Sequence, residues 1–231
     1  MPESPMPESP MSESPMSESP MPESPASERT MINNRTMITE QAVGAEDRLR
    51  LMVILGSTRP ERLCSAVADW FLERIVDDRR FSVDLCDLAE LELPSDLTGG
   101  GDTDAFTKRI DEADAVVIIT PEYNRGYPGV LKIAIDSVRD EWQAKPIGFV
   151  SYGGVSGGLR SVEQLRGVFG ELHAVTLRDT VSIPNVADVF DDRRRLRDSC
   201  RFDAAAEALL RRLLWWGRVT SDALRRVPYP V

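Results

Sequence analysis

The chain has 231 residues, of which 28 are Lys or Arg and 38 are Asp or Glu, and 42% of its residues are hydrophobic. This length gives room for one well-packed domain and a smaller addition. Six of the acidic residues lie in residues 1–28, which hold no Lys or Arg, so the rest of the chain is only mildly acidic. The absence of a basic stripe argues against nucleic acid as a partner. No apolar run approaches the roughly 18 residues that span a bilayer, which argues against a membrane partner.

The cysteine and histidine content excludes further classes of protein. The three cysteines, Cys64, Cys86 and Cys200, form no C-x-x-C pair, so neither a disulfide scaffold nor a clustered zinc site is indicated. The N-terminus has neither the basic region nor the apolar region of a secretory signal, and we therefore expect a cytoplasmic protein. His173 is the single histidine, which limits the acid–base and metal chemistry that the chain can perform.

The first 25 residues are five copies of the pentapeptide M-[PS]-E-S-P. Five residues is no structural period, and the frequent proline opposes both helix and sheet. Ordering such a stretch would cost backbone entropy that little apolar burial offsets. We therefore expect a disordered acidic tail at 1–47, a folded domain at 48–190, and a C-terminal helical extension at 191–231. The extension would pack on the domain or at a subunit interface.

From Arg50 onward, short apolar runs alternate with amphipathic stretches. In chain order, the patterns predict strands at 51–55, 81–85, 116–119, 147–150 and 174–177, and helices at 64–76, 104–113, 130–142, 159–169 and 202–214, the last of which could extend to 224. The continuous apolar runs are typical of strands buried on both faces. The alternation predicts an α/β fold, a doubly wound five-stranded parallel sheet with helices on both faces.

Three loops follow the strongest strands: G-S-T-R-P-E-R at 56–62, P-E-Y-N-R-G-Y at 121–127 and S-Y-G-G-V-S-G-G at 151–158. In an open parallel sheet, the carboxyl ends of the strands gather at one edge. Ligands bind at that edge where the winding order reverses. We therefore expect the three loops to lie together and to form the functional site.

The first loop is suited to a phosphate group. Gly56 permits the turn, the hydroxyls of Ser57 and Thr58 can donate hydrogen bonds, and Arg59 and Arg62 supply charge in a planar, bidentate form. The loop matches neither G-x-x-x-x-G-K-[ST] nor G-x-G-x-x-G, so a single monophosphate fits it best. The alternative is an ordinary strand-to-helix turn with a capping serine and two solvated arginines.

The second and third loops are suited to a flat heteroaromatic ring. Tyr123, Asn124 and Tyr127 offer flat apolar faces and amide hydrogen bonds, and Gly153 and Gly154 let a planar ligand approach the backbone closely. The alternative for each loop is a connection rich in proline and glycine with aromatic packing.

Taken together, the loop motifs resemble those of the NADPH-dependent FMN reductases, a family with the flavodoxin-like fold. The family pattern G-S-x-R stands at 56–59, T-P-E-Y-N-x-G-Y-P-G-x-L-K at 120–132 and S-Y-G-G-x-S-G-G-L-R at 151–160, and the resemblance extends over about 51–184. It implies that the FMN phosphate is held by Ser57, Arg59 and Arg62. It also implies that the isoalloxazine ring and ribityl chain are lined by Pro121, Glu122, Tyr123, Asn124, Tyr152, Gly153 and Gly154. Ile133 departs from the asparagine that the family usually places there.

The resemblance implies an FMN-dependent oxidoreductase that passes hydride between NADPH and bound FMN and reduces a small acceptor such as a flavin or quinone. The cofactor carries such chemistry, so no catalytic His or Cys is required. An FMN-dependent dehydrogenase that acts on a small cyclic metabolite, and a flavin electron-transfer module, stay open. Members of the family are commonly homodimers or homotetramers, and the apolar cluster at 213–216 could belong to the core or to a subunit contact.

A serine hydrolase is the minor alternative. The sequence G-V-S-G-G at 154–158 matches G-x-S-x-G between a predicted strand and a predicted helix, the context of a nucleophile elbow. Ser156 would then be the nucleophile and His173 its base, with Glu163 or Glu171 as the acid.

Overall fold

The structure is a computed structural model that describes residues 48–230, so the predicted tail at 1–47 lies outside the described residues. In chain order, its elements are β1 (Leu49–Leu55), α1 (Cys64–Leu72), β2 (Phe81–Asp87), η2 (Leu88–Glu90), α2 (Thr103–Glu112), β3 (Ala115–Pro121), α3 (Gly129–Asp136), η3 (Asp140–Trp142), β4 (Pro146–Tyr152), α4 (Leu159–Glu171), β5 (Val175–Ile183), α5 (Val186–Val189) and α6 (Cys200–Arg226). The two η elements are short 3-10 helices.

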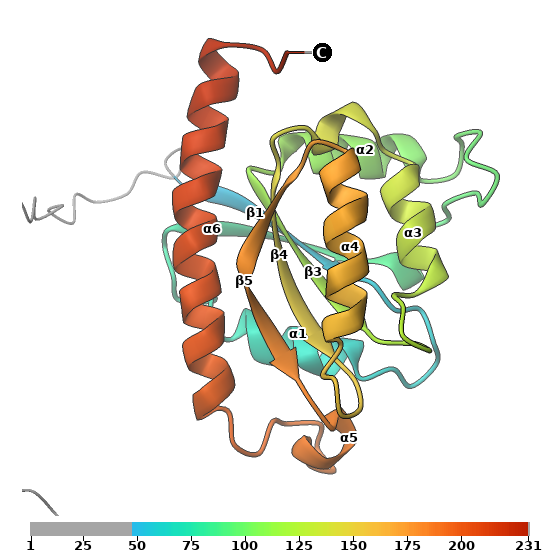
Figure 1. Cartoon of the computed structure of the whole chain (residues 1–231), viewed down its shortest axis with the longest axis vertical. Helices are drawn as coiled ribbons and strands as arrows, with labels where there is room; N and C mark the ends of the chain where they lie inside the picture. The colour runs from blue at the N-terminus through green and yellow to red at the C-terminus, as the bar shows by residue number, and fades with distance from the viewer. Residues whose placement is uncertain (1–47, 231) are drawn as a thin grey trace, which may run out of the picture. The chain divides into compact units, whose positions relative to one another are not determined.

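The five strands form one parallel sheet in the order β2-β1-β3-β4-β5 (Figure 1). The chain first winds from β1 to β2 and then crosses back to β3, so the winding order reverses between β1 and β3. Every residue of β3 and β4 is buried, as their unbroken apolar runs predicted. The doubly wound five-stranded sheet of the sequence analysis is confirmed.

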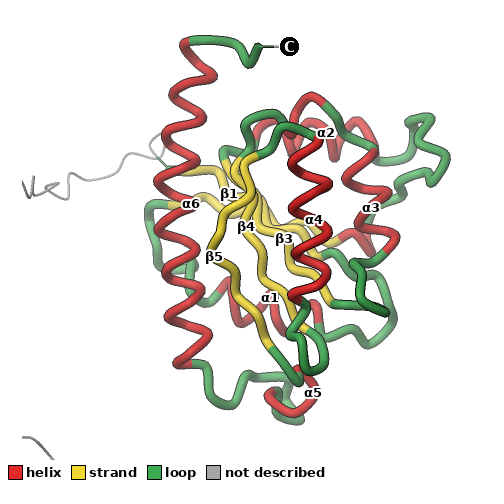
Figure 2. The backbone as a smooth tube through the Cα atoms, in the orientation of Figure 1, coloured by secondary structure: helices red, strands yellow, loops and turns green. Residues whose placement is uncertain are grey.

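Helices cover both faces of the sheet (Figure 2). Because side chains alternate along a strand, Leu51 and Val53 of β1 join a core with α1 and α6, whereas Met52 and Ile54 join a second core with α2, α3 and α4. Helix α6 approaches β4 closely at Gly148, where an added Cβ would lie 3.0 Å from the side chain of Leu209. The C-terminal helix is thus one of the layers of the fold.

Two elements differ most in length from the prediction, and the helix predicted at 64–76 also ends early, at Leu72. The helix predicted at 130–142 ends at Asp136 and is followed by η3, and the Ser137 hydroxyl donates to the carbonyl of Ile133 at 2.7 Å, a bond that competes with helix continuation. Strand β5 extends to Ile183, beyond the predicted 177. It is an edge strand with a register irregularity opposite Gly148, so polar residues such as Asp179 interrupt its apolar pattern.

Within residues 48–230, no helix combines the length and the apolar character needed to cross a bilayer.

Candidate functional site

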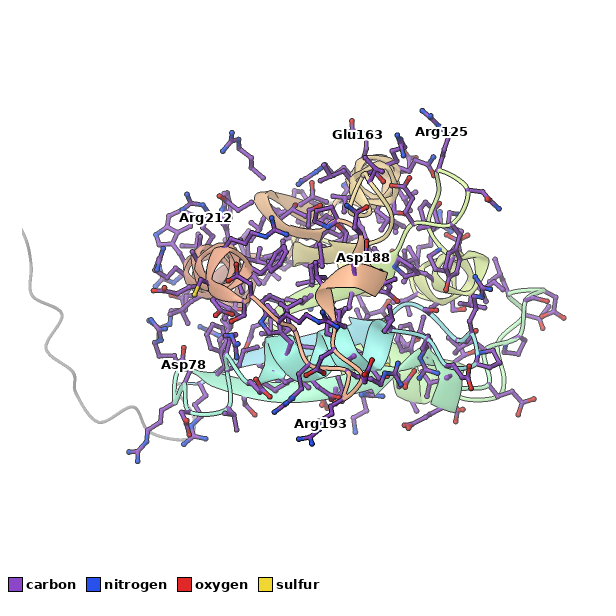
Figure 3. The ribbon with its side chains drawn as sticks, turned by 90° about the horizontal axis from the view of Figure 1, so that it is seen from below. Asp78, Arg125, Glu163, Asp188, Arg193 and Arg212 are labelled. Carbon is purple, nitrogen blue, oxygen red and sulfur yellow. The ribbon has the colours of Figure 1, made fainter. Side chains whose placement is uncertain are left out.

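The three predicted loops meet at the carboxyl edge of the sheet, which faces the viewer in Figure 3. They follow β1, β3 and β4, which are neighbours in the sheet order. Backbone hydrogen bonds join them: Gly56 N–H donates to the carbonyl of Ile119 at 2.8 Å, and Glu122 N–H donates to the carbonyl of Tyr152 at 3.0 Å. The topology therefore brings together the residues that the sequence singled out.

The first loop is held against the second by Ser57 and Arg59. The Ser57 side chain is fully buried, with its Oγ 2.7 Å from the hydroxyl of Tyr123, and the guanidinium of Arg59 lies 5.1 Å from the centre of the Tyr123 ring. The capping-serine alternative is wrong, because α1 is capped by Leu63 without a side-chain bond. Within the described residues, the backbone N–H groups of Ser57, Thr58 and Arg59 donate to no backbone carbonyl, but that of Ser57 interacts with the Cys64 thiol. The N–H groups of Thr58 and Arg59 are thus free donors just before a helix N-terminus, where anions are stabilised.

Arg62 has a partner that the sequence did not indicate. Its Nη2 donates to Oδ2 of Asp87, and the two side chains are only 19% and 15% exposed. The register between β1 and β2 places Asp87 beside Leu55, at the same edge of the sheet. The Nε of Arg62 is buried and has no hydrogen-bond partner. Arg62 therefore brings little net charge to the loop but keeps one donor free.

The second loop contains a tight two-residue turn. Tyr123 and Gly126 exchange backbone hydrogen bonds of 2.8 and 3.0 Å, and the two residues between them, Asn124 and Arg125, have φ values of 49° and 71°. Positive φ at both central residues is the requirement of a type I′ turn. The buried Ser161 hydroxyl fixes this turn from α4, because its Oγ lies 2.8 Å from the carbonyl oxygen of Gly126. Asn124 is held at the open rim of the site.

Glu122 ties the second loop to the third. Its Oε2 accepts hydrogen bonds from the Ser156 hydroxyl at 2.7 Å and from the backbone N–H of Arg160 at 3.1 Å, and Arg160 Nη1 lies 2.7 Å from Oε1. Burial acts to raise the pKa of this carboxyl group, but the bonds from Arg160 and Ser156 outweigh it and hold the pKa below its usual value. The side chain is thus occupied between the loops, and only the backbone of Glu122 can line a ligand.

Tyr152 is the last residue of β4 and lies next to the first loop. Its ring is buried, and its hydroxyl lies beside the Cys64 thiol and the Ser57 hydroxyl but makes no hydrogen bond of full geometry. Its pKa is raised far above the usual value by burial and by the neighbouring Cys64. Burial also raises the pKa of the Cys64 thiol, to about 11. Cys64 is therefore protonated and unreactive at neutral pH, and the Tyr152 hydroxyl can act only as a neutral donor or acceptor.

The four glycines of the third loop divide into two kinds. Gly157 and Gly158 have φ values of 61° and 86°, and an added Cβ at Gly158 would lie 2.7 Å from the backbone nitrogen of Tyr152. These two glycines are needed by the loop itself. An added Cβ at Gly153 would make only ordinary contacts, and at Gly154 it would meet nothing within 4 Å. Gly154 therefore borders open space at the edge of the sheet, as a closely approaching ring requires.

The pattern of unsatisfied polar atoms tests whether a mononucleotide fits this site. Among residues 48–230, two buried side-chain polar atoms lack a hydrogen-bond partner, Arg62 Nε and Tyr152 OH. Leaving such a group unpaired costs about 1–3 kcal/mol, so native proteins rarely do so without a reason. Both atoms belong to residues that the sequence assigned to the flavin. The free donors and the open space at Gly154 fit a phosphate group joined to a planar ring.

The geometry excludes the serine hydrolase. Ser156 precedes α4, whereas His173 follows its end, and a helix of 13 residues is about 20 Å long. The ring of His173 is exposed, and its Nδ1 lies 3.2 Å from the hydroxyl of Tyr229. Ser156 has no histidine base and instead donates its hydrogen bond to Glu122.

The position that departs from the family pattern lies beside the site. Ile133 lines a pocket of about 290 Å³ together with Thr58, Leu88, Ala89, Leu91, Leu93 and Val130. The segment 88–93 follows β2 and carries no motif, so the sequence analysis did not indicate it. This pocket adds an apolar wall next to the first loop.

The five-stranded parallel sheet with helices on both faces is a flavodoxin-like fold, and the three motif loops meet at its carboxyl edge. A model of the family described as NADPH-dependent FMN reductase matches residues 49–188. The chain belongs to this family, whose members are oxidoreductases that use FMN and NADPH. The predicted resemblance is confirmed.

Individual relatives agree with this assignment. The chain is 40% identical over 134 residues to an NAD(P)H-dependent FMN reductase of Schizosaccharomyces pombe, a match that covers 53% of this chain and 66% of that protein, just under two thirds of its length. It is 33% identical over 147 residues to a probable NADPH:quinone oxidoreductase of Oryza sativa subsp. japonica, which covers 58% of this chain and 75% of that protein. A flavoenzyme NAD(P)H:(acceptor) oxidoreductase from Paracoccus denitrificans has the same fold, with a TM-score of 0.61 at 22% identity over 74% of this chain and 98% of that chain.

Proposed function

We propose that this protein binds FMN at the carboxyl edge of its sheet and uses NADPH to reduce a small organic acceptor. The observation that carries the proposal is that the loops with the family motifs also contain the unsatisfied polar atoms. Arg62 Nε and Tyr152 OH are buried without partners in the same loops that carry the motifs. A bound mononucleotide would supply the missing partners.

The phosphate end would lie over the first loop. The free N–H groups of Thr58 and Arg59 can donate to phosphate oxygens, and the N-terminus of α1 adds a favourable dipole. The guanidinium of Arg59 and the Nε of Arg62 can add charge-assisted bonds. The hydroxyl of Ser57 would support the phosphate end from the buried side of the loop, because it is buried and already linked to Tyr123.

The ring end would lie between the second and third loops. Gly154 leaves room for a planar group, with Gly153 and the backbone of Pro121 and Glu122 beside it. Asn124 is held on a rigid turn at the rim, where its amide can hydrogen-bond the ring edge. FMN supplies the hydride chemistry when bound, and the chain's own task is to hold and orient it.

The clamp from Glu122 to Ser156 and Arg160 would keep the two ring-binding loops at a fixed separation. The carboxylate accepts three hydrogen bonds from the third loop and the start of α4. Pre-organised loops avoid an entropic cost when the cofactor binds. Glu122 is thus a positioning residue, and we assign no catalytic side chain.

We further propose a quinone or a free flavin as the acceptor. Such flat molecules can occupy the place that nicotinamide leaves, and the names of relatives point to the same class. A dehydrogenase acting on a small cyclic metabolite would use the same site. A flavin electron-transfer module would bind FMN without reacting with NADPH.

One experiment separates the reductase from the electron-transfer module. The purified chain is loaded with FMN, freed of excess cofactor and mixed with NADPH in the absence of oxygen, and the visible flavin absorbance is followed. Rapid bleaching without a second protein, and recovery of the absorbance when a benzoquinone is added, are expected of the reductase. Flavin that stays oxidised would contradict the reductase and favour the electron-transfer module. Failure to retain FMN would overturn the whole proposal.

We also propose a homodimer or homotetramer that works in the cytoplasm. Trp215 is 58% exposed on α6 and lies beside Trp216, with ring centres 5.0 Å apart, and exposed aromatic side chains are enriched at subunit interfaces. Cys64, Cys86 and Cys200 are all free thiols, which suits a reducing compartment. Light scattering of the native chain and of Trp215→Ala would test the assembly, since a native monomer would contradict it.

A further inference from the structure

The connection between β5 and α6 crosses the carboxyl edge and reaches the first loop. It begins beside the third loop, where Asn185 N–H donates to the carbonyl of Gly154 at 2.8 Å and Val186 N–H donates to that of Gly153 at 2.9 Å. Beyond α5, Phe190 is buried in the core on the α1 side of the sheet. The family match ends at residue 188, so the following residues are not described by the family pattern.

This connection contains a turn that holds Arg194 in an unfavourable backbone conformation. Asp191 and Arg195 close the turn through a hydrogen bond of 2.9 Å, and Arg194 N–H donates to the carbonyl of Asp191 at 2.8 Å. The Asp191 carboxylate also accepts from the backbone N–H groups of Arg193 and Arg195. Arg194 has a φ of 59°, which is uncommon for a residue with a side chain. Strained residues of this kind cluster at functional sites.

The side chain of Arg194 reaches the first loop. Its Nη2 donates to the carbonyl oxygen of Arg62. The N–H of Arg62 in turn donates to the carbonyl oxygen of Arg59, which closes a turn within the first loop. Arg195, the neighbour of Arg194, pairs with Asp191. Within the described residues, Arg194 makes no ion pair. One of its five donors is used, and its charge is uncompensated.

The charge balance of the loop leaves a place for this arginine. The FMN phosphate carries nearly two negative charges at neutral pH, since the second pKa of a phosphate monoester is about 6. The first loop offers Arg59 and Arg62, but Asp87 neutralises Arg62 and the loop also carries Glu61. Together these four side chains leave no net positive charge against the two negative charges of the phosphate. Arg194 adds a positive charge at this loop.

We propose that Arg194 is a phosphate-binding residue of the cofactor site, contributed by the connection to α6 from outside the family motifs. The proposal rests on the proposed function, because it takes FMN as the ligand. Its chemistry is specific: the guanidinium recognises the phosphate and makes no contact with the ring. Arg194 should therefore matter for FMN and not for riboflavin, which lacks the phosphate.

The test is an equilibrium titration of the full chain with FMN and with riboflavin, followed by quenching of flavin fluorescence. Arg194→Ala should weaken FMN binding by about 3-fold to 30-fold, the range expected for a charge-assisted bond at an exposed position, and should leave riboflavin binding unchanged. The matched control is Arg193→Ala. Arg193 lies in the same turn and carries the same charge, but its side chain points outward at the rim in Figure 3. Its loss should change FMN affinity less than 2-fold.

A second variant keeps the backbone conformation intact. Glycine adopts positive φ without strain, so Arg194→Gly removes the charge while preserving the turn and should reproduce the loss seen with alanine. If either variant binds FMN as tightly as the native chain, or weakens FMN and riboflavin equally, Arg194 is not a phosphate ligand. These outcomes leave the proposed function intact. It falls instead if the native chain binds no FMN.

Discussion

The two edges of the sheet differ in how their buried polar groups are satisfied. At the amino edge, the ammonium group of Lys145 donates to the carbonyls of Ala113 at 2.6 Å and Asp111 at 3.3 Å. The carboxylate of Asp114 accepts from Arg50 N–H and from the Ser221 hydroxyl, both at 2.8 Å. At the carboxyl edge, Arg62 Nε and Tyr152 OH are buried without partners.

The satisfied groups mark the edge that stabilises the fold, and the unsatisfied groups mark the edge that binds a ligand. A polar group buried with its partners contributes to stability and needs nothing else. A polar group buried without a partner is costly unless a ligand completes it. The amino edge is therefore the structural edge, and the carboxyl edge is the binding edge. Paired polar side chains of the amino edge should therefore affect stability, whereas residues of the carboxyl edge that border the open space should affect binding.

The largest effect is expected from glycines of the binding edge. Gly158→Ala forces a positive φ on a residue with a side chain and pushes its Cβ against the backbone of Tyr152, so the free energy of unfolding should fall by about 3–5 kcal/mol. Gly154→Ala is the matched control, because its Cβ meets nothing. It should change stability by less than about 0.5 kcal/mol but weaken FMN binding. Urea unfolding measures the stability and flavin titration measures the affinity. Equal destabilisation by both variants would contradict the division of the third-loop glycines into two kinds.

The structural edge should reveal itself through pH. Burial lowers the pKa of Lys145 to about 8 from 10.5, so between these values the unfolded chain binds a proton that the folded chain does not. Stability must therefore rise with pH over this window, by up to roughly 3 kcal/mol from this group alone. Lys145→Met removes that contribution.

The readout is the difference between the unfolding free energies of the native chain and Lys145→Met from pH 7.5 to 10.5. A difference is needed because Cys64 and Cys86, whose pKa values are raised by burial to about 11, oppose the trend above pH 9 in both proteins. A difference that stays flat with pH would show that Lys145 is not desolvated. FMN affinity should be the same in both proteins at neutral pH.

A single charge at the binding edge should act on affinity and not on stability. Arg59 is exposed, and its contact is the ring of Tyr123, so Arg59→Ala should leave the unfolding free energy nearly unchanged. The same variant should weaken FMN binding by about 1.5–3 kcal/mol, the value of a charge-assisted bond. Fluorescence titration measures the affinity, with riboflavin as the ligand that lacks the phosphate. Unchanged FMN affinity would place the phosphate elsewhere.

The smallest effect is expected at Ser156. Its hydroxyl donates one hydrogen bond to Glu122, so Ser156→Ala should reduce the unfolding free energy by about 1 kcal/mol and leave reduction by NADPH nearly intact. Any ester hydrolysis by the native chain should be equally present in the variant. An ester hydrolysis that the native chain performs and Ser156→Ala does not would instead show that Ser156 is a nucleophile, against the geometry.

The local pattern of the sequence was enough to predict the fold class and to find the three loops. Buried parallel strands leave continuous apolar runs, and β3 and β4 were recognised from theirs. Strand β5 was predicted too short, because an edge strand with a register irregularity carries polar residues. The end of α3 was also missed, because the Ser137 hydrogen bond that competes there is a local detail without a periodic signal.

The partners within the site could not be predicted from sequence. Asp87 neutralises Arg62 from the end of β2, and Arg160 engages Glu122 from the start of α4, although nothing in spacing marks either pair. Arg194 lies in a run of three arginines between acidic residues, a pattern that sets none of the three apart. Its contact with Arg62 depends on how the connection to α6 crosses the sheet edge.

The order of apolar runs, turns and motifs along the chain determined the parallel sheet, the loops at its edge and the family. Those signals are local, since each depends on residues a few positions apart. The tertiary structure alone decided which charges are already paired, which donors are free and which glycines face open space. These properties depend on residues brought together from different strands, and their energies change with burial, which no stretch of sequence contains.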